Sequence, residues 1–217
     1  MRAIFRTIHG ILPVSLFLLA LGAAAAADLP YEPDDSKEIS AYLVDKTWVE
    51  QGPDCEIRVR MITEAERLAF MEKTTGYRID PYASPPDQEP RFISLLLEIE
   101  NRSEGQIYFQ SQSAWLRAGT QIQNPLGIDG LSSTYAVVEM EMGSAYEAVR
   151  PAIMEGSCTI VAGETKRGIL IYRKVKGRTK KFYLEMQLTM PTGELMRVTA
   201  PYRLIKKSKK DKKDKKK

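Results

Sequence analysis

The feature that most constrains the fold is an alternation of apolar and polar side chains near the C-terminal end of the chain. The segment KFYLEMQLTM, residues 181–190, carries apolar side chains at every second position. A period of two is typical of a β-strand with one buried face. A PTG turn at residues 191–193 follows, and the alternation resumes over residues 195–204. The pattern predicts a β-hairpin.

Other segments repeat this pattern over shorter lengths. Residues 91–100, RFISLLLEIE, and residues 106–110, QIYFQ, alternate on either side of the turn NRSEG, which predicts a second hairpin. Residues 55–61 (CEIRVRM), 113–118 (SAWLRA) and 168–174 (GILIYRK) predict further short strands, because they combine alternation with β-branched or aromatic side chains.

Two short helices are expected between the strands. Thr63 and Glu66 have the spacing of a capping box at the start of one helix, and Gly76 stands where that helix should end. Ser144 and Glu147 repeat the capping spacing further along the chain. Both helices would therefore be insertions in a chain made mainly of strands.

The order of these elements favours a single domain with two packed sheets. Residues 37–205 are predicted to form a mainly β fold, an antiparallel immunoglobulin-like β-sandwich with one or two short helical insertions. A small barrel is the alternative architecture. Residues 28–36 and the Pro-rich residues 79–90 are expected to be loops, the first of them a flexible N-terminal segment.

Two stretches resemble a known group of proteins. FISLLLEIENRSEGQIYF, residues 92–109, and AGETKRGILIY, residues 162–172, are similar to segments of the extracellular immunoglobulin-like domains of many uncharacterised bacterial secreted proteins. In those domains a strand ending in Glu-Asn-x-Ser leads into a hairpin, and a Gly-Glu segment precedes a strand that ends in an aromatic residue. The resemblance implies the sandwich fold and no particular activity, since such sandwiches host many functions.

The first 27 residues predict export. Arg2 and Arg6 precede an apolar run at residues 11–21, and alanines at residues 25–27 precede Asp28. This is the organisation of a cleaved secretory signal peptide. A membrane-spanning helix needs roughly 20 apolar residues, so the mature chain is expected to lack a transmembrane segment and to lie in the periplasm or outside the cell. An uncleaved membrane anchor is the alternative.

Cleavage of the signal peptide would also remove His9, the one histidine of the chain. Ser-His-Asp and Cys-His nucleophile pairs need histidine, and histidine is the commonest ligand of zinc and copper. We therefore predict no catalytic residue, no cofactor and no metal ligand in the mature protein.

Cys55 and Cys158 are the two cysteines of the chain. Each is in phase with apolar neighbours on a predicted strand, so both sulfurs would point toward a buried face. An even number of cysteines in an exported chain suggests a disulfide. We expect a Cys55–Cys158 bridge, and two buried thiols in a reducing compartment are the alternative.

The net charge of +4 is unevenly distributed, because residues 206–217 contribute +7 and residues 1–27 contribute +2, which leaves −5 for the body. A disordered polylysine tail attracts polyanions without reading sequence, and without aromatic residues it cannot stack on bases. We expect weak contact with an anionic surface, of lipid, polysaccharide or extracellular DNA, and no sequence-specific nucleic-acid binding; a tail that only aids solubility is the alternative. The predicted contact residues are Lys206, Lys207, Lys209, Lys210, Lys212, Lys213, Lys215, Lys216 and Lys217.

Glu98 and Glu100 are candidate catalytic carboxylates. They lie two apart on a predicted strand and would project on one face, and a pair of carboxylates can serve as acid and base in glycoside hydrolysis. A solvated polar face is the simpler interpretation. Trp48 and Trp115 are similarly interpreted as core or rim residues in preference to a sugar-stacking platform.

Two metal sites can also be considered. Thioether sulfurs suit Cu(I), but methionine on the apolar face of a strand more simply fills core space. Asn124 and Asp129 could join acidic residues on Ca²⁺, but their spacing departs from that of a calcium loop and fits an ordinary turn. The methionines in question are Met140, Met142, Met154, Met186, Met190 and Met196.

These observations favour an exported, non-enzymatic binding or scaffolding protein. Its partner would be another envelope protein or an anionic surface that its tail contacts. A cell-envelope glycan-acting enzyme that uses carboxylates alone is the alternative, and it would depend on Glu98 and Glu100.

Overall fold

The computed structural model describes residues 31–36, 39–85, 88–132, 147–175 and 179–205. The predicted signal peptide, residues 1–27, and the lysine tail, residues 206–217, lie outside the described residues. The same holds for Met140, Met142 and Ser144.

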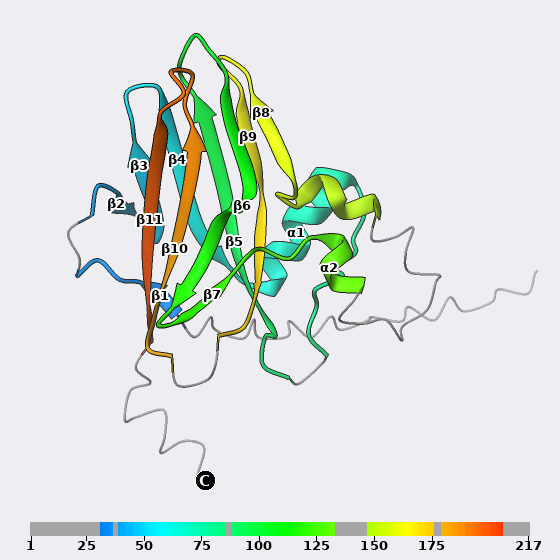
Figure 1. The fold of residues 1–217 in the computed structure, drawn as a ribbon. Helices are drawn as coiled ribbons and strands as arrows, with labels where there is room; N and C mark the ends of the chain where they lie inside the picture. The colour runs from blue at the N-terminus through cyan, green and yellow to red at the C-terminus, as the bar shows by residue number, and fades with distance from the viewer. Residues whose placement is uncertain (1–30, 37–38, 86–87, 133–146, 176–178, 206–217) are drawn as a thin grey trace, which may run out of the picture.

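Two antiparallel sheets pack together as a β-sandwich, which confirms the predicted fold class (Figure 1). The first sheet has six strands in the order β1-β11-β10-β6-β7, with β8 also paired to β6. These strands are β1 (Tyr31–Pro33), β6 (Ile107–Ala118), β7 (Gln121–Gln123), β8 (Ser157–Ile160), β10 (Lys181–Thr189) and β11 (Leu195–Leu204).

The second sheet has five strands in the order β2-β3-β4-β5-β9. Residues Asp45 and Lys46 between β2 and β3 both have positive φ, of 45° and 62°, as the tight two-residue turn of a hairpin requires. The strands are β2 (Tyr42–Val44), β3 (Thr47–Gln51), β4 (Cys55–Ile62), β5 (Phe92–Asn101) and β9 (Thr165–Arg173).

The main core lies between the sheets and follows the two-residue alternation. Phe182, Leu184, Met186 and Leu188 of β10 are all buried in one cluster with residues of β4, β5 and β9. Each side chain of this size contributes about 1.5–3 kcal/mol when it leaves water. The alternation therefore sets both the strand and the face that it buries.

One predicted hairpin is confirmed and the other is wrong. β10 and β11 pair along their whole length, from Lys181 opposite Arg203 to Thr189 opposite Leu195. In contrast, β5 and β6 belong to different sheets. The buried Asn101 side chain donates from Nδ2 to the carbonyl oxygens of Gly105 and Ile160, each at 2.8 Å. This amide holds a corner at which the chain crosses between the sheets.

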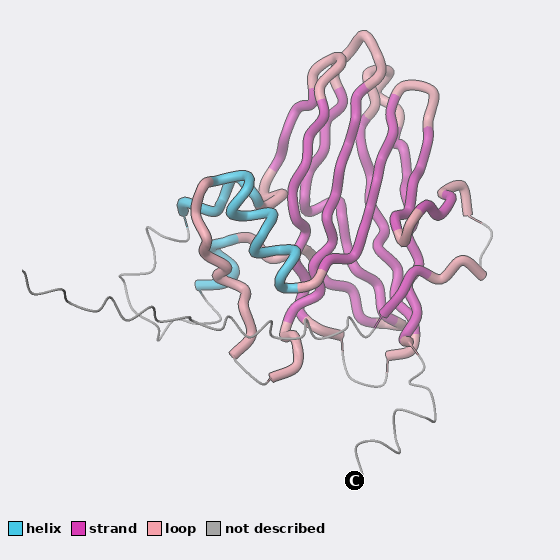
Figure 2. Tube along the Cα trace, turned by 180° about the vertical axis from the view of Figure 1, so that it is seen from behind, coloured by secondary structure: helices cyan, strands magenta, loops and turns pink. Residues whose placement is uncertain are grey.

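A helical layer covers one half of the outer face of the five-stranded sheet (Figure 2). The predicted capping box is confirmed: Thr63 and Glu66 bond reciprocally at the start of α1 (Glu64–Thr75), and Gly76 ends it at φ 78°. α2 (Ile128–Ser132) and the 3-10 helix η2 (Arg150–Ala152) complete the layer. Apolar side chains of the three elements and of β4, β5 and β9 form a second buried cluster.

Arg67 of α1 fastens this layer to the sheet. Its side chain is 1% exposed, and it lies 2.8 Å from Asp80 Oδ2. It also donates to Ser94 Oγ on β5 at 2.7 Å and to the carbonyl oxygen of Tyr82 at 2.8 Å. The Pro-rich loop, α1 and β5 are therefore joined through one guanidinium group.

Two further predictions need correction. Residues 31–33, which we expected in a flexible segment, form β1 and pair with β11 from Tyr31–Leu204 to Pro33–Tyr202. The expected disulfide is absent, because Cys55 and Cys158 are both free thiols. Cys55 Sγ points instead toward Met196 Sδ, 3.2 Å away.

Candidate functional site

The uncovered half of the outer face of the five-stranded sheet carries a row of charged side chains. Arg58 of β4 lies opposite Glu98 of β5, which lies opposite Arg167 of β9. Facing positions in a sheet are about 5 Å apart, so the pairing of three strands from distant parts of the sequence brings these groups together.

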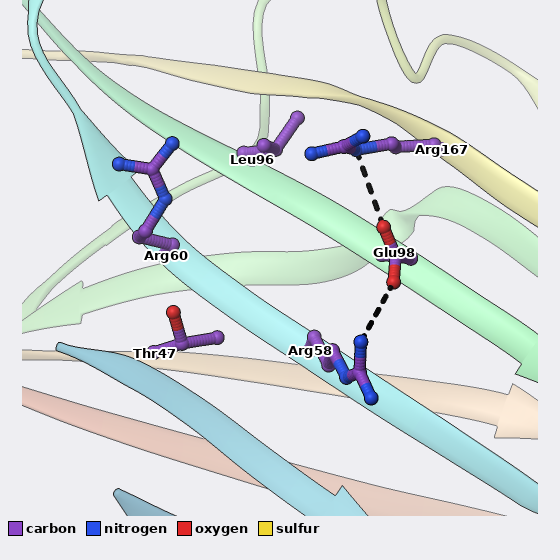
Figure 3. A pocket seen from close by; sticks show the side chains of 6 residues that line it. All are labelled: Thr47, Arg58, Arg60, Leu96, Glu98 and Arg167. Carbon is purple, nitrogen blue, oxygen red and sulfur yellow. Dashed lines mark hydrogen bonds and ion pairs between the residues drawn. The ribbon is translucent and has the colours of Figure 1, made fainter. Parts of the chain in front are cut away.

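Glu98 is held between the two arginines (Figure 3). Its Oε1 lies 3.4 Å from Arg58 Nη1 and its Oε2 lies 3.2 Å from Arg167 Nε. Arg167 is supported from the helical layer as well, because its guanidinium lies 5.5 Å from the ring centroid of Phe70 in α1. Such a cation–π contact restrains the arginine without using its N–H groups.

The next row of the sheet adds a third arginine. Arg60 lies opposite Leu96, and its Nη1 is 2.5 Å from Oε1 of Glu66, the residue that caps α1. A depression of about 150 Å³ opens between the two rows. It is lined by Thr47, Arg58, Arg60, Leu96, Glu98 and Arg167 (Figure 3). We call this set of residues the Arg-lined depression.

The N–H groups of these arginines are not all used by the carboxylates. Arg60 engages Glu66 through Nη1 alone, and Arg167 engages Glu98 through Nε alone. A guanidinium has five N–H donors, and the two side chains are 36% and 47% exposed. Donors on both sides of Leu96 therefore remain available to a bound group.

The second candidate carboxylate, Glu100, takes part in a neighbouring ion-pair cluster. Arg102 Nη2 lies 2.8 Å from Glu100 and 2.7 Å from Glu56. The hydrogen bond from Arg102 lowers the pKa of Glu100 below its ordinary value. A general acid needs a raised pKa to keep its proton near neutrality. Glu98 and Glu100 thus share a face as predicted, but arginines pair with both of them.

The tryptophans lie where the core-or-rim interpretation placed them. Trp48 is 3% exposed and donates from Nε1 to the carbonyl oxygen of Pro201 at 3.0 Å, which links the two sheets. Trp115 lies on β6 and bonds Glu185. Neither tryptophan lines the Arg-lined depression.

The metal-site alternatives find no support in the side-chain positions. Met154, Met186, Met190 and Met196 lie in or against the main core. Asn124 bonds Gln112, and Asp129 pairs with Arg150. Within the described residues no group of three or more His, Cys, Asp or Glu side chains gathers in metal-binding geometry.

Burial raises the pKa values of the two thiols and so lowers their reactivity. It raises the pKa of Cys55 to about 11 and also raises the pKa of Cys158. Since the thiolate is the nucleophile, both sulfurs are poorly reactive near neutral pH.

Sequence reasoning did not identify the three arginines as a site. Arg58 and Arg60 stand in the polar phase of CEIRVRM, which signals an exposed face and nothing more. Their convergence with Arg167 depends on the pairing of β5 with both β4 and β9, and periodicity does not reveal which strands pair.

Comparisons with known proteins find similarity to solved structures alone. No protein-family model and no curated protein matches the chain. Similar solved structures include the YjhA protein from Bacillus subtilis, 12% identical over 77% of this chain and 88% of that one, with a TM-score of 0.35. A functionally unknown protein from Listeria monocytogenes EGD-e is also 12% identical, over 73% and 77% of the two chains, again with a TM-score of 0.35. Separately, no helix among the described residues is long and apolar enough to span a membrane.

Proposed function

We propose that the protein is an exported, non-enzymatic binding protein whose Arg-lined depression holds an anionic group of its ligand. The observation that carries this proposal is the convergence of three guanidinium groups on one depression with Glu98 as its single lining carboxylate. Guanidinium groups bind carboxylate and phosphate through paired hydrogen bonds.

The surroundings favour an anion that lies over Leu96. Arg60 of β4 lies opposite this residue, and Arg167 of β9 lies diagonally across from it, opposite Glu98 (Figure 3). Glu66 and Phe70 of α1 restrain the two arginines, so little side-chain entropy is lost on binding. The Thr47 hydroxyl, which also lines the depression, would complete the contact surface.

Export and the accessory role of the tail belong to the same proposal. The arrangement of Arg2, Arg6 and the apolar residues 11–21 supports export to the periplasm or beyond. The nine lysines of residues 206–217 would give weak, non-specific contact with an anionic surface. Specific binding is assigned to the folded face.

A non-enzymatic role is supported by the ion pairs of the two candidate carboxylates. Glu98 pairs with Arg58 and Arg167, and Glu100 pairs with Arg102. Turnover of cell-wall fragments by the purified protein, lost in Glu98→Gln or Glu100→Gln, would instead establish the glycan-acting enzyme.

The proposal can be tested with tripolyphosphate as a probe of anion binding. Calorimetric titration of the full chain and of a chain that ends at Ile205 separates the tail from the folded face. We expect the shortened chain to bind, and Arg60→Gln/Arg167→Gln to weaken its binding at least about tenfold, because charge-assisted hydrogen bonds contribute about 1.5–3 kcal/mol each.

Arg78→Gln provides the matched control, since Arg78 is an exposed arginine that pairs with Glu72 at 3.3 Å outside the depression. It should bind tripolyphosphate as the unmodified chain does. Equal binding by the double variant, or none by the chain that ends at Ile205, would rule out the Arg-lined depression as the anion site.

A further inference from the structure

The outer face of the six-stranded sheet carries aromatic side chains that the main core does not use. Tyr108 and Trp115 of β6 and Tyr183 of β10 lie on this face, because each occupies the phase opposite to a buried neighbour. The helical layer packs on the other sheet. β6, β10 and β11 lie side by side in this sheet (Figure 1).

A network of polar contacts fixes two of the rings. Trp115 Nε1 donates to Glu185 Oε2 at 2.9 Å, and Arg117 Nε donates to Glu185 Oε1 at 2.8 Å. The Arg117 guanidinium lies 5.1 Å from the centroid of the Tyr183 ring. The indole and phenol rings are therefore positioned before any ligand arrives, which reduces the entropic cost of binding.

The pairing of β6 with β10 is interrupted beside a depression that Trp115 lines. Leu188 pairs with Phe109 and Met186 pairs with Ala114, so residues 110–113 of β6 stand opposite Gln187 alone. Irregularities in a ladder redirect side chains and often lie next to binding sites. The depression has a volume of about 250 Å³. It is lined by Trp115, Glu185, Met186, Gln187, Arg197, Val198 and Thr199.

Three polar side chains in this depression have no bonding partner among the described residues. Gln187 and Arg197 lie directly opposite each other on β10 and β11, and Thr199 follows two residues along β11. Glu185 and Arg117, in contrast, are engaged with each other. An amide, a hydroxyl and a guanidinium thus converge beside an indole ring with their hydrogen-bonding capacity unused.

We propose that this face binds an acidic saccharide, a pyranose chain that carries carboxylate groups. The apolar C–H face of a pyranose matches the indole of Trp115, because the ring face is apolar and electron-rich. Gln187 and Thr199 can exchange hydrogen bonds with ring hydroxyls. Arg197 supplies the positive charge and the planar fork that recognise a carboxylate.

The charge of the depression favours an acidic ligand over a neutral one. Glu185 is already neutralised by Arg117, and Arg197 has no carboxylate partner among the described residues. Arg197 therefore contributes an uncompensated positive charge. The proposal concerns a different sheet from the Arg-lined depression and does not depend on it.

Calorimetric titration of the full chain with three small ligands tests the ligand class. Trigalacturonate presents sugar rings with carboxylates, maltotriose presents rings alone, and triglutamate presents carboxylates alone. We expect trigalacturonate to bind at least about tenfold more tightly than either of the others, since each lacks one of the two recognised features.

Variants assign the binding to this face. Trp115→Ala should abolish trigalacturonate binding, whereas Trp115→Phe should retain it within about threefold, because an aromatic face is kept. Arg197→Gln should reduce the affinity for trigalacturonate to that for maltotriose. Unchanged thermal unfolding midpoints would confirm that the variants fold.

Controls come from exposed residues of the same types elsewhere. The titrations are made in the Arg60→Gln/Arg167→Gln background, so that the Arg-lined depression does not contribute to carboxylate binding. In that background Tyr77→Ala and Arg78→Gln should leave the affinity for trigalacturonate unchanged. Binding of triglutamate as tight as that of trigalacturonate would replace the proposal with an acidic-peptide surface. No binding of trigalacturonate, or binding indifferent to Trp115→Ala, would overturn it.

Discussion

Arg67 is the charged side chain on which the attachment of α1 depends. It is buried with Asp80, whose side chain is 5% exposed. Removal of one partner from such a pair leaves an uncompensated buried charge and typically costs about 3–5 kcal/mol. We therefore expect Arg67→Met to lower the free energy of unfolding by this amount in urea titrations.

The double variant Arg67→Met/Asp80→Leu separates the ion pair from the packing. It should lose less stability than Arg67→Met, because no isolated charge remains. Arg78→Ala, at an exposed position near the end of the same helix, should change stability by less than about 0.5 kcal/mol. A full loss in the double variant would show that the shape of Arg67 matters more than its charge.

At the scale of single residues, the sequence predicts whether a side chain is buried or exposed, but it does not predict which residues that side chain contacts. The alternation in KFYLEMQLTM predicts the burial of Phe182 and Leu184. It also places Glu98 on a polar face, but not between Arg58 and Arg167. Contacts of that kind join residues about 40 and 70 positions apart, so they arise from tertiary pairing.

At the scale of elements, β1 is the strand that local pattern failed to predict. It has three residues, YEP, and ends in a proline. Proline cannot donate to a ladder and is confined to edges and strand ends. The hydrogen bonds that hold β1 come from β11, which lies at the far end of the described sequence.

Asp34 secures the end of this strand and provides a test by pH. The carboxylate is 1% exposed and lies 2.6 Å from Lys181 Nζ. Burial pushes its pKa upward, but hydrogen bonds from Lys181 and Ser36 lower it overall. A lowered pKa in the folded state stabilises the protein above about pH 4 and loses this effect as the pH falls through the folded-state pKa.

We expect Asp34→Asn to cost about 1–3 kcal/mol of unfolding free energy at pH 7. The difference from the unmodified chain should shrink as the pH falls below about 4 and disappear below the folded-state pKa, where Asp34 is protonated in both the folded and the unfolded chain. Urea titrations at several pH values measure it. Asp35→Asn changes an exposed carboxylate 3.8 Å from Arg203 and should have little effect throughout. A difference that persists at low pH would assign the role of Asp34 to packing.

Helix ends and hairpins differ in how local their signals are. Both ends of α1 are predictable because their hydrogen bonds form within one segment, between Thr63 and Glu66 at the start and from Gly76 N–H to the Glu72 carbonyl oxygen at the end. The turn NRSEG predicts a hairpin for the same local reason. The structure makes it a crossing between sheets, because Asn101 bonds Ile160, 59 residues away.

At the scale of the whole molecule, the two-sheet architecture follows from the number of short alternating segments, but the exposed faces do not. Strand order decides that Arg58 and Arg167 share one face and that Trp115 and Arg197 share another. The helical layer then covers half of one face and leaves the other uncovered by any described helix. Both candidate sites therefore depend on strand order and on which face the helices cover.

The lysine tail is expected to affect the adhesion of the whole molecule but not its stability. We expect a chain that ends at Ile205 to keep its melting temperature, because a low-complexity charged segment cannot contribute a core. We expect the full chain to co-sediment with anionic vesicles at about 0.05 M salt and to lose this binding at about 0.5 M, because screening increases. The chain that ends at Ile205 should not co-sediment at either salt concentration. A large drop in melting temperature, or adhesion indifferent to salt, would contradict this expectation.

The pairing of β1 with β11 affects the rate and the order of folding. Their contacts span 171 residues, as in the ion pair between Glu32 and Arg203, and distant pairings of this kind slow folding. A chain that emerges from a ribosome or an export channel in order, N-terminal end first, has no partner for its first described strand until β11 arrives. Pairing of β1 therefore waits for residues 195–204, and a chain cut before residue 195 exposes the open edges of β1 and β10, which invite aggregation.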